Sequence, residues 1–135
     1  MNSNPLFDST PEPTSKNSLR ILVAEDDLNI RDLLYLILTQ AGYLVSTASD
    51  GLCASSAIAS DAFDLVITDH EMPRLNGLGL VKQLRSVNYP GKIIVLSSPP
   101  SMADRGAYKG LSVDRMLSKP CLNELLIQTI EEVTH

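Results

Sequence analysis

The chain has 135 residues, of which 44% are hydrophobic, and this is enough for one domain with a substantial core. Its formal net charge of −5 argues against direct nucleic-acid binding, because affinity for phosphate backbones comes mainly from Lys and Arg. The same charge disfavours an anionic membrane surface. No apolar stretch approaches the ~20 residues of a membrane span and no secretory signal pattern is present, so we expect a cytoplasmic protein.

Two segments of different composition divide the chain. Residues 1–18 are rich in Ser, Asn, Thr and Pro and have no sustained apolar period, which predicts a disordered leader. Residues 19–135 are expected to form the single folded domain. Cys53 and Cys121 are too few and too far apart for a disulfide scaffold or a zinc site, so we interpret them as reduced, packed thiols.

Short apolar runs alternate with helical patterns throughout the folded part. The predicted strands are LRILVA (19–24), YLVSTAS (43–49), the run ending at Asp69, KIIVLSS (92–98) and RMLS (115–118). The predicted helices cover 28–41, 52–60, 77–86, 102–109 and 121–133, the fourth being weakened by Gly106. This alternation predicts a doubly wound, five-stranded parallel sheet of strand order 2-1-3-4-5 in a three-layer α/β/α sandwich.

Polar side chains stand at the end of four of these strands. They are Glu25 and Asp26 after the first, Asp69 at the end of the third, Ser97 in the fourth and Lys119 after the fifth. The ends of parallel strands lie on one side of the sheet, and the first and third strands are neighbours in the predicted order, so Glu25, Asp26 and Asp69 should meet. We interpret Asp27 as the cap of the following helix.

Three carboxylates that are close together need compensating positive charge. A like-charged pair at ~4 Å costs about 4 kcal/mol at an effective dielectric near 20. Lys119 supplies one positive charge, and Mg²⁺, which accepts carboxylate oxygens while keeping several waters, suits the remainder. Such a site favours phosphoryl transfer to Asp69 as the nucleophile.

Four motifs in order, ILVAEDDLNIR, DLVITDHEMPRLNG, IIVLSS and SKP, resemble the receiver domain of two-component response regulators. The resemblance covers about residues 19–133 and implies a flavodoxin-like, chemotaxis-regulator-like fold. It implies that Asp69 accepts a phosphoryl group from a histidine kinase or histidine phosphotransfer protein, and that the module then switches a downstream protein target rather than turning over substrate. The implied Mg²⁺ ligands are Glu25, Asp26, Asp69 and the backbone carbonyl of Glu71, and the implied phosphoryl-binding residues are Ser97 and Lys119.

Some positions depart from this family's pattern. The family usually has a switch aromatic three residues before the lysine, where this chain has Met116, and Pro99-Pro100 should stiffen the loop after Ser97. The Lys119–Pro120 bond is expected by resemblance to be cis. The alternative function is a pseudo-receiver that binds a partner without phosphorylation. A small hydrolase using Asp69 as a turnover nucleophile would usually have a second aspartate where this chain has Glu71.

Overall fold

A computed structural model describes residues 19–98, 102–119 and 124–135. The predicted leader (1–18), the Pro99-Pro100 pair and the Lys119–Pro120 bond lie outside the described residues, and so does Cys121. These four expectations therefore stay predictions, whereas Cys53 is described and is exposed, so the prediction that it is a packed thiol is wrong.

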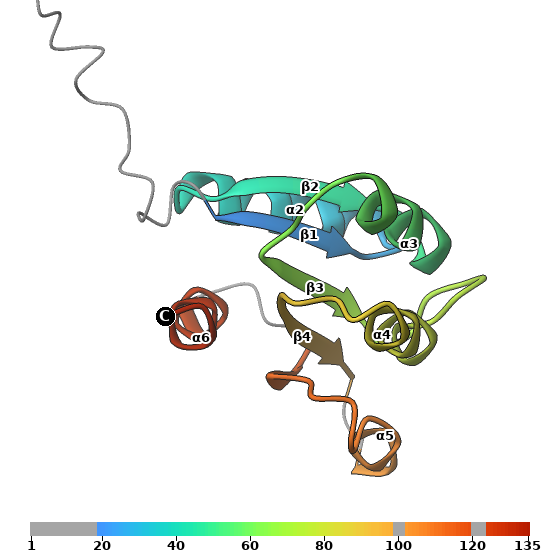
Figure 1. Cartoon of the computed structure of the whole chain (residues 1–135). Helices are drawn as coiled ribbons and strands as arrows, with labels where there is room; N and C mark the ends of the chain where they lie inside the picture. Colours follow the sequence, from blue (N-terminus) through green and yellow to red (C-terminus); the bar gives the residue numbers. More distant parts are fainter. Residues whose placement is uncertain (1–18, 99–101, 120–123) are drawn as a thin grey trace, which may run out of the picture.

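Five parallel strands form one sheet of order β2-β1-β3-β4-β5, with helices on both faces (Figure 1). The strands are β1 (Arg20–Ala24), β2 (Leu44–Ala48), β3 (Leu65–Asp69), β4 (Lys92–Ser97) and β5 (Arg115–Ser118). The helices are α2 (Leu28–Gln40), α3 (Gly51–Ser60), α4 (Gly77–Ser86), α5 (Met102–Ala107) and α6 (Glu124–Val133). The predicted fold class and strand order are confirmed.

Burial follows the position of each strand in the sheet. Every residue of β3 is buried, and all but the first residue of β1 and β4 are buried too, as expected for strands covered on both faces. The edge strands β2 and β5 are mostly exposed or half-buried. The three central strands therefore fix the positions of the residues at their ends.

Two hydrophobic cores lie on opposite faces of the sheet. One contains buried side chains of α3 and α4 together with Tyr108, and the other contains those of α2 and α6. Alternate residues of a strand point into opposite cores, so that Leu22 belongs to the first and Val23 to the second. In Figure 1, α3, α4 and α5 accordingly lie on one side of the sheet, and α2 and α6 lie on the other.

Three helices begin at a polar cap. The side chain of Asp27 accepts hydrogen bonds from the backbone N–H groups of Asn29 and Ile30 at the start of α2, which confirms its predicted capping role. Asp50 and Asn76 cap α3 and α4 in the same way. Each cap directs the chain from the end of a strand back along the sheet.

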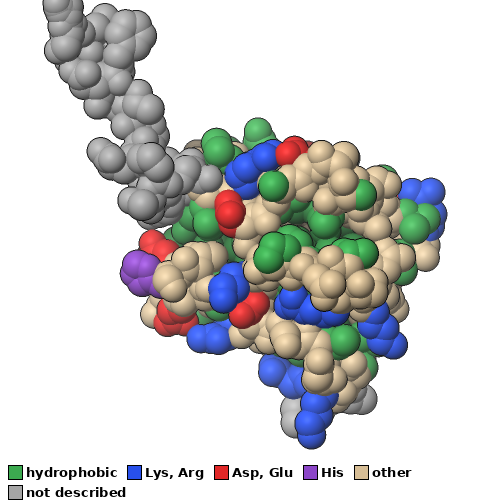
Figure 2. Space-filling model, in the orientation of Figure 1, with side chains coloured by type: hydrophobic (Ala, Val, Ile, Leu, Met, Phe, Trp, Pro, Cys, Tyr) green, Lys and Arg blue, Asp and Glu red, His purple; other side chains and the backbone are tan. Residues whose placement is uncertain are grey.

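Charged side chains are unevenly distributed over the surface. On the face shown in Figure 2, Lys and Arg side chains gather around α4 and α5, although the whole chain carries a net charge of −5. None of the helices in the described segments is both long and apolar enough to pass through a membrane.

Candidate functional site

The register between β1 and β3 places two acids side by side. Ala24 pairs with Thr68, so the next residues along the two strands are Glu25 and Asp69. Glu25 is 1% exposed and Asp69 is 4% exposed. The two carboxylates are therefore held on neighbouring buried strands, at the edge of the sheet where they were predicted to meet.

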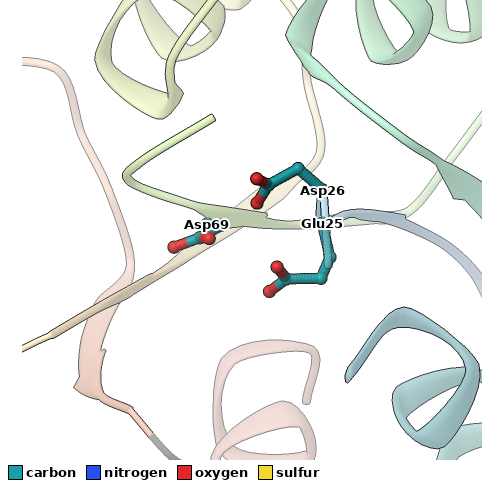
Figure 3. A group of neighbouring side chains, drawn as sticks. All are labelled: Glu25, Asp26 and Asp69. Atoms are coloured by element: carbon teal, nitrogen blue, oxygen red, sulfur yellow. The ribbon is translucent and has the colours of Figure 1, made fainter. Parts of the chain in front are cut away.

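Asp26 completes an acidic cluster with these two residues. One carboxylate oxygen from each of Glu25, Asp26 and Asp69 lies within 4.8 Å of the others. Figure 3 shows the three side chains turned toward a common space, with Asp26 approaching from the β1–α2 loop. Asp26 is exposed, so the cluster opens to solvent on its side.

Lys119 reaches the cluster from the end of β5. Its Nζ donates a hydrogen bond to Asp69 Oδ2 at 2.9 Å and lies 3.4 Å from Glu25 Oε1. Its backbone N–H donates to the carbonyl of Ser97 at 2.8 Å, which anchors the residue beside β4. The structure thus brings four of the predicted site residues together from three strands.

Burial and mutual charge shift the pKa values of Glu25 and Lys119. Desolvation raises the pKa of the Glu25 carboxyl, and the charge of Asp69 adds to this, while the Asp27 N–H and Lys119 oppose it. Burial alone would lower the pKa of the Lys119 ammonium, but Asp69 and Glu25 outweigh that effect and raise it. At neutral pH Lys119 is consequently a fixed cation facing an excess of negative charge.

One buried oxygen of the cluster indicates that a cation fits here. Glu25 Oε1 is inaccessible to solvent and has no hydrogen-bond partner among the described residues, although Lys119 lies near it. Such an atom costs free energy unless it gains a partner. Because all donors are carboxylate oxygens and the charge excess is negative, the set suits a hard divalent cation such as Mg²⁺.

Ser97, the predicted phosphoryl-binding serine, and Met116, at the position of the family's switch aromatic, lie at different depths. Ser97 is the last residue of β4 and is buried, whereas Ser98 follows the strand and is exposed. Ser97 is thus the serine that lies in the strand next to Asp69. Met116 is half-buried and packs against the core that contains Tyr108.

The loop after Asp69 forms one wall of a pocket at this edge. The backbone N–H of Glu71 lies 3.4 Å from Asp69 Oδ1, and the Glu71 side chain is exposed. The pocket is lined by Asp26, His70, Glu71, Met72, Pro73 and Asn76. Of the three clustered acids, Asp26 lines this pocket, so the pocket lies beside the acidic cluster.

Two pairs beside the site were not predicted from the sequence. His70 Nδ1 and the Tyr108 hydroxyl are 2.7 Å apart, in a hydrogen bond between residues 38 positions apart. The Arg74 guanidinium donates two hydrogen bonds to Asp50 Oδ2, at 2.9 and 2.6 Å. No local pattern in the sequence identifies Tyr108 as the distant partner of His70.

Comparison with known proteins gives a consistent result. A family model described as the response regulator receiver domain matches residues 21–131. Response regulator MprA of Mycobacterium ulcerans (strain Agy99) is 43% identical over 110 residues, covering 81% of this chain and 47% of that protein. The chain thus spans about half the length of the curated relatives it matches.

Solved structures resemble the whole described fold. Chemotaxis protein CheY4 of Vibrio cholerae has a TM-score of 0.80 at 30% identity, covering 85% of this chain and 98% of that one. Response regulator TrrA of Thermotoga maritima, solved in complex with Mg²⁺-BeF, has a TM-score of 0.77 at 32% identity, covering 86% and 99%.

Proposed function

Because this chain belongs to the response regulator receiver domain family, we propose that it is a phospho-accepting module of a two-component phosphorelay. Asp69 takes the phosphoryl group, and the donor is the phosphohistidine of a histidine kinase or of a histidine phosphotransfer protein. The phosphorylated form then changes the binding of a downstream protein. The module acts by signalling and not as a turnover enzyme.

In the proposed transfer a carboxylate oxygen of Asp69 attacks the phosphorus atom of the phosphohistidine. An oxygen–phosphorus bond forms, the nitrogen–phosphorus bond breaks, and its electron pair returns to the imidazole. Lys119, already bonded to Asp69 Oδ2, orients the nucleophile and offsets negative charge as it develops on the phosphoryl oxygens. The Ser97 hydroxyl is the proposed partner of the phosphoryl group once it is attached.

Glu25, Asp26, Asp69 and the backbone carbonyl of Glu71 are the residues that would hold Mg²⁺. A bound Mg²⁺ supplies positive charge that lets an anionic phosphodonor approach an acidic cluster. The cluster of three carboxylates supports this assignment, and so does Glu25 Oε1, which has no hydrogen-bond partner in the described part of the chain. The similarity to TrrA, whose structure is a complex with Mg²⁺-BeF, supports it as well.

The observation that carries the proposal is the Lys119–Asp69 hydrogen bond beside two acids from β1. A pseudo-receiver would need no such assembly, and the features that suggested one give it little support. Met116 is accommodated at the edge of a core, and Pro99-Pro100 lie outside the described residues.

The direct test is phosphoryl uptake by the full chain. Incubation with a small-molecule phosphodonor such as phosphoramidate and Mg²⁺ should add one phosphoryl group, measured by intact mass. Asp69→Asn should abolish uptake. Asp64→Asn is the matched control, because Asp64 stands just before the opposite end of the same strand, β3. Equal uptake by the wild type and the Asp69→Asn variant would refute the proposal.

A further inference from the structure

Tyr108 connects the end of α5 to the residue that follows the phospho-acceptor. It comes directly after α5 and is only 3% exposed. Its hydroxyl is 2.7 Å from Nδ1 of His70, and the two rings meet edge to face with centroids 5.5 Å apart. His70 is the next residue after Asp69, so one side-chain contact joins α5 to the acceptor loop.

The Tyr108 hydroxyl occupies a space left at the start of α4. A Cβ atom at Gly77 would lie 2.9 Å from this hydroxyl and would clash with the carbonyl oxygen of Asp69. Any larger residue at position 77 would therefore displace one of them. Because Gly77 has no side chain, the end of β3, the start of α4 and the Tyr108 hydroxyl can lie in close contact.

The main chain of His70 is held independently of its side chain. Its N–H donates to the carbonyl of Leu96 at 2.8 Å, and its carbonyl accepts from Gly77 N–H at 2.9 Å. Only two rotatable side-chain bonds separate this fixed backbone from the ring that meets Tyr108. A shift of the acceptor loop therefore moves the His70 ring directly against the Tyr108 hydroxyl.

The His70–Tyr108 contact supplies an aromatic ring and a hydroxyl that Met116 lacks. By resemblance this position usually carries the aromatic ring that responds to phosphorylation, and methionine offers neither a ring nor a hydroxyl. Met116 packs against the same hydrophobic core as Tyr108. Tyr108 places an aromatic ring in that core, and its hydroxyl reaches the acceptor loop.

We propose that the His70–Tyr108 hydrogen bond couples the phosphorylation state of Asp69 to the end of α5. Tyr108 is a positioning residue that acts through His70, and the inference rests on the proposed function. Engagement of the phosphoryl group at Asp69 fixes the acceptor loop, which holds His70 against Tyr108 and orders the segment 105–111. Removal of the hydroxyl breaks this coupling while the ring stays packed.

The test compares amide hydrogen exchange of residues 105–111 in the full chain with Mg²⁺, before and after adding beryllofluoride as the phosphoryl mimic. In the wild type the mimic should slow exchange in this segment. In Tyr108→Phe the mimic should still bind, but the slowing should fall about fivefold, the effect of one lost hydrogen bond. Tyr89→Phe is the matched control: its buried hydroxyl donates to the carbonyl of Phe63, away from the site.

A double-mutant cycle separates coupling from general destabilisation. His70→Ala and Tyr108→Phe should each reduce the slowing of amide exchange by the mimic. The combined variant should reduce it little further, because both substitutions remove the same hydrogen bond. The inference is overturned if Tyr108→Phe responds as strongly as the wild type, or if wild-type residues 105–111 do not respond although the mimic is bound. If the wild type takes up neither the mimic nor a phosphoryl group, the proposed function itself fails, and the inference fails with it.

Discussion

Charged residues are paired differently at the two ends of the sheet. At the amino end, the Arg20 guanidinium donates to both carboxylate oxygens of Asp61, at 2.8 and 2.7 Å. The backbone N–H of Arg20 donates to Asp64. At the carboxyl end, Glu25 and Asp69 are buried, and Lys119 lies between them.

Other polar groups at the amino end are paired one to one. The Tyr89 hydroxyl donates to the carbonyl of Phe63 at 2.9 Å, and the backbone N–H of Ile93 donates to Asp114 Oδ2 at 2.8 Å. This end is built for stability, because each of these buried or half-buried groups has a partner.

The carboxyl end keeps an imbalance of charge instead. Its three carboxylates face one ammonium group among the described residues, and Glu25 Oε1 has no hydrogen-bond partner there. Such an arrangement lowers stability and is typical of functional sites. One-to-one polar pairs and the proposed functional site thus occupy opposite ends of one sheet, so substitutions at the two ends should differ in their response to Mg²⁺.

The largest effect is expected from Lys119→Met. Without the ammonium, Glu25 and Asp69 face each other with no counter-charge, so the free energy of unfolding in EDTA should fall by about 2 kcal/mol, the cost of leaving a buried acceptor without its donor. Added Mg²⁺ should stabilise this variant more than the wild type, because the site is more negative. Urea unfolding with and without Mg²⁺ measures both effects.

Lys92→Met is the control for this loss, since Lys92 is exposed at the start of β4. It should change neither the stability in EDTA nor the response to Mg²⁺ appreciably. A response to Mg²⁺ that is weaker in Lys119→Met than in the wild type would contradict the charge argument.

A smaller effect of opposite sign is expected from Glu25→Gln. The raised pKa of Glu25 means that the folded state binds this proton more tightly than the unfolded state does. The contribution of Glu25 to stability therefore decreases as pH rises from the ordinary glutamate range through its raised pKa. In EDTA at neutral pH, the free energy of unfolding of Glu25→Gln should be about 1 kcal/mol higher than that of the wild type.

A pH series of urea unfolding curves checks this sign. The difference between Glu25→Gln and the wild type should shrink toward acidic pH, where the wild-type carboxyl is protonated. If the variant is less stable than the wild type at neutral pH without Mg²⁺, ionised Glu25 stabilises the fold and the contrast between the two ends is wrong.

Asp26 and Asp27 offer a neighbouring pair with opposite roles. Asp26 lies in the acidic cluster, whereas Asp27 caps α2. Asp26→Asn should weaken the stabilisation by Mg²⁺ without destabilising the metal-free protein. Asp27→Ala should lower stability by about 1 kcal/mol, as lost caps do, and leave the response to Mg²⁺ intact.

Thermal unfolding of both variants at several Mg²⁺ concentrations separates the two roles. The result that would count against the assignment is a loss of the Mg²⁺ response in Asp27→Ala with an unchanged response in Asp26→Asn.

The sheet and most of the site could be predicted because they depend on regular rules. Buried strands are short apolar runs, and parallel strands joined by helices bring their carboxyl ends together. These rules place Glu25 beside Asp69 without any knowledge of side-chain conformation. The predicted helix 102–109 was slightly too long: α5 ends at Ala107, and two further residues continue as a tight turn.

The contacts of the surrounding loops could not be predicted in the same way. The His70–Tyr108 pair depends on where α5 ends and on how two side chains point across 38 positions of sequence. Arg74 reaches Asp50 from a backbone with φ of 68°, a conformation that arginine seldom adopts. Asp50 caps α3, and its second contact, with Arg74, depends on this unusual loop.

The smallest effect is expected at the amino end, from Arg20→Gln. Arg20 and Asp61 form a bidentate pair, but both side chains are substantially exposed, at 38% and 49%. Solvent and salt screen such a pair, so the melting temperature should fall only slightly, and less at high ionic strength. The stabilisation by Mg²⁺ should equal that of the wild type, because the substitution lies at the far end of the sheet from Asp69. A reduced response to Mg²⁺ in this variant would show that the two ends are energetically coupled, and the separation of stability from function along the strands would not hold.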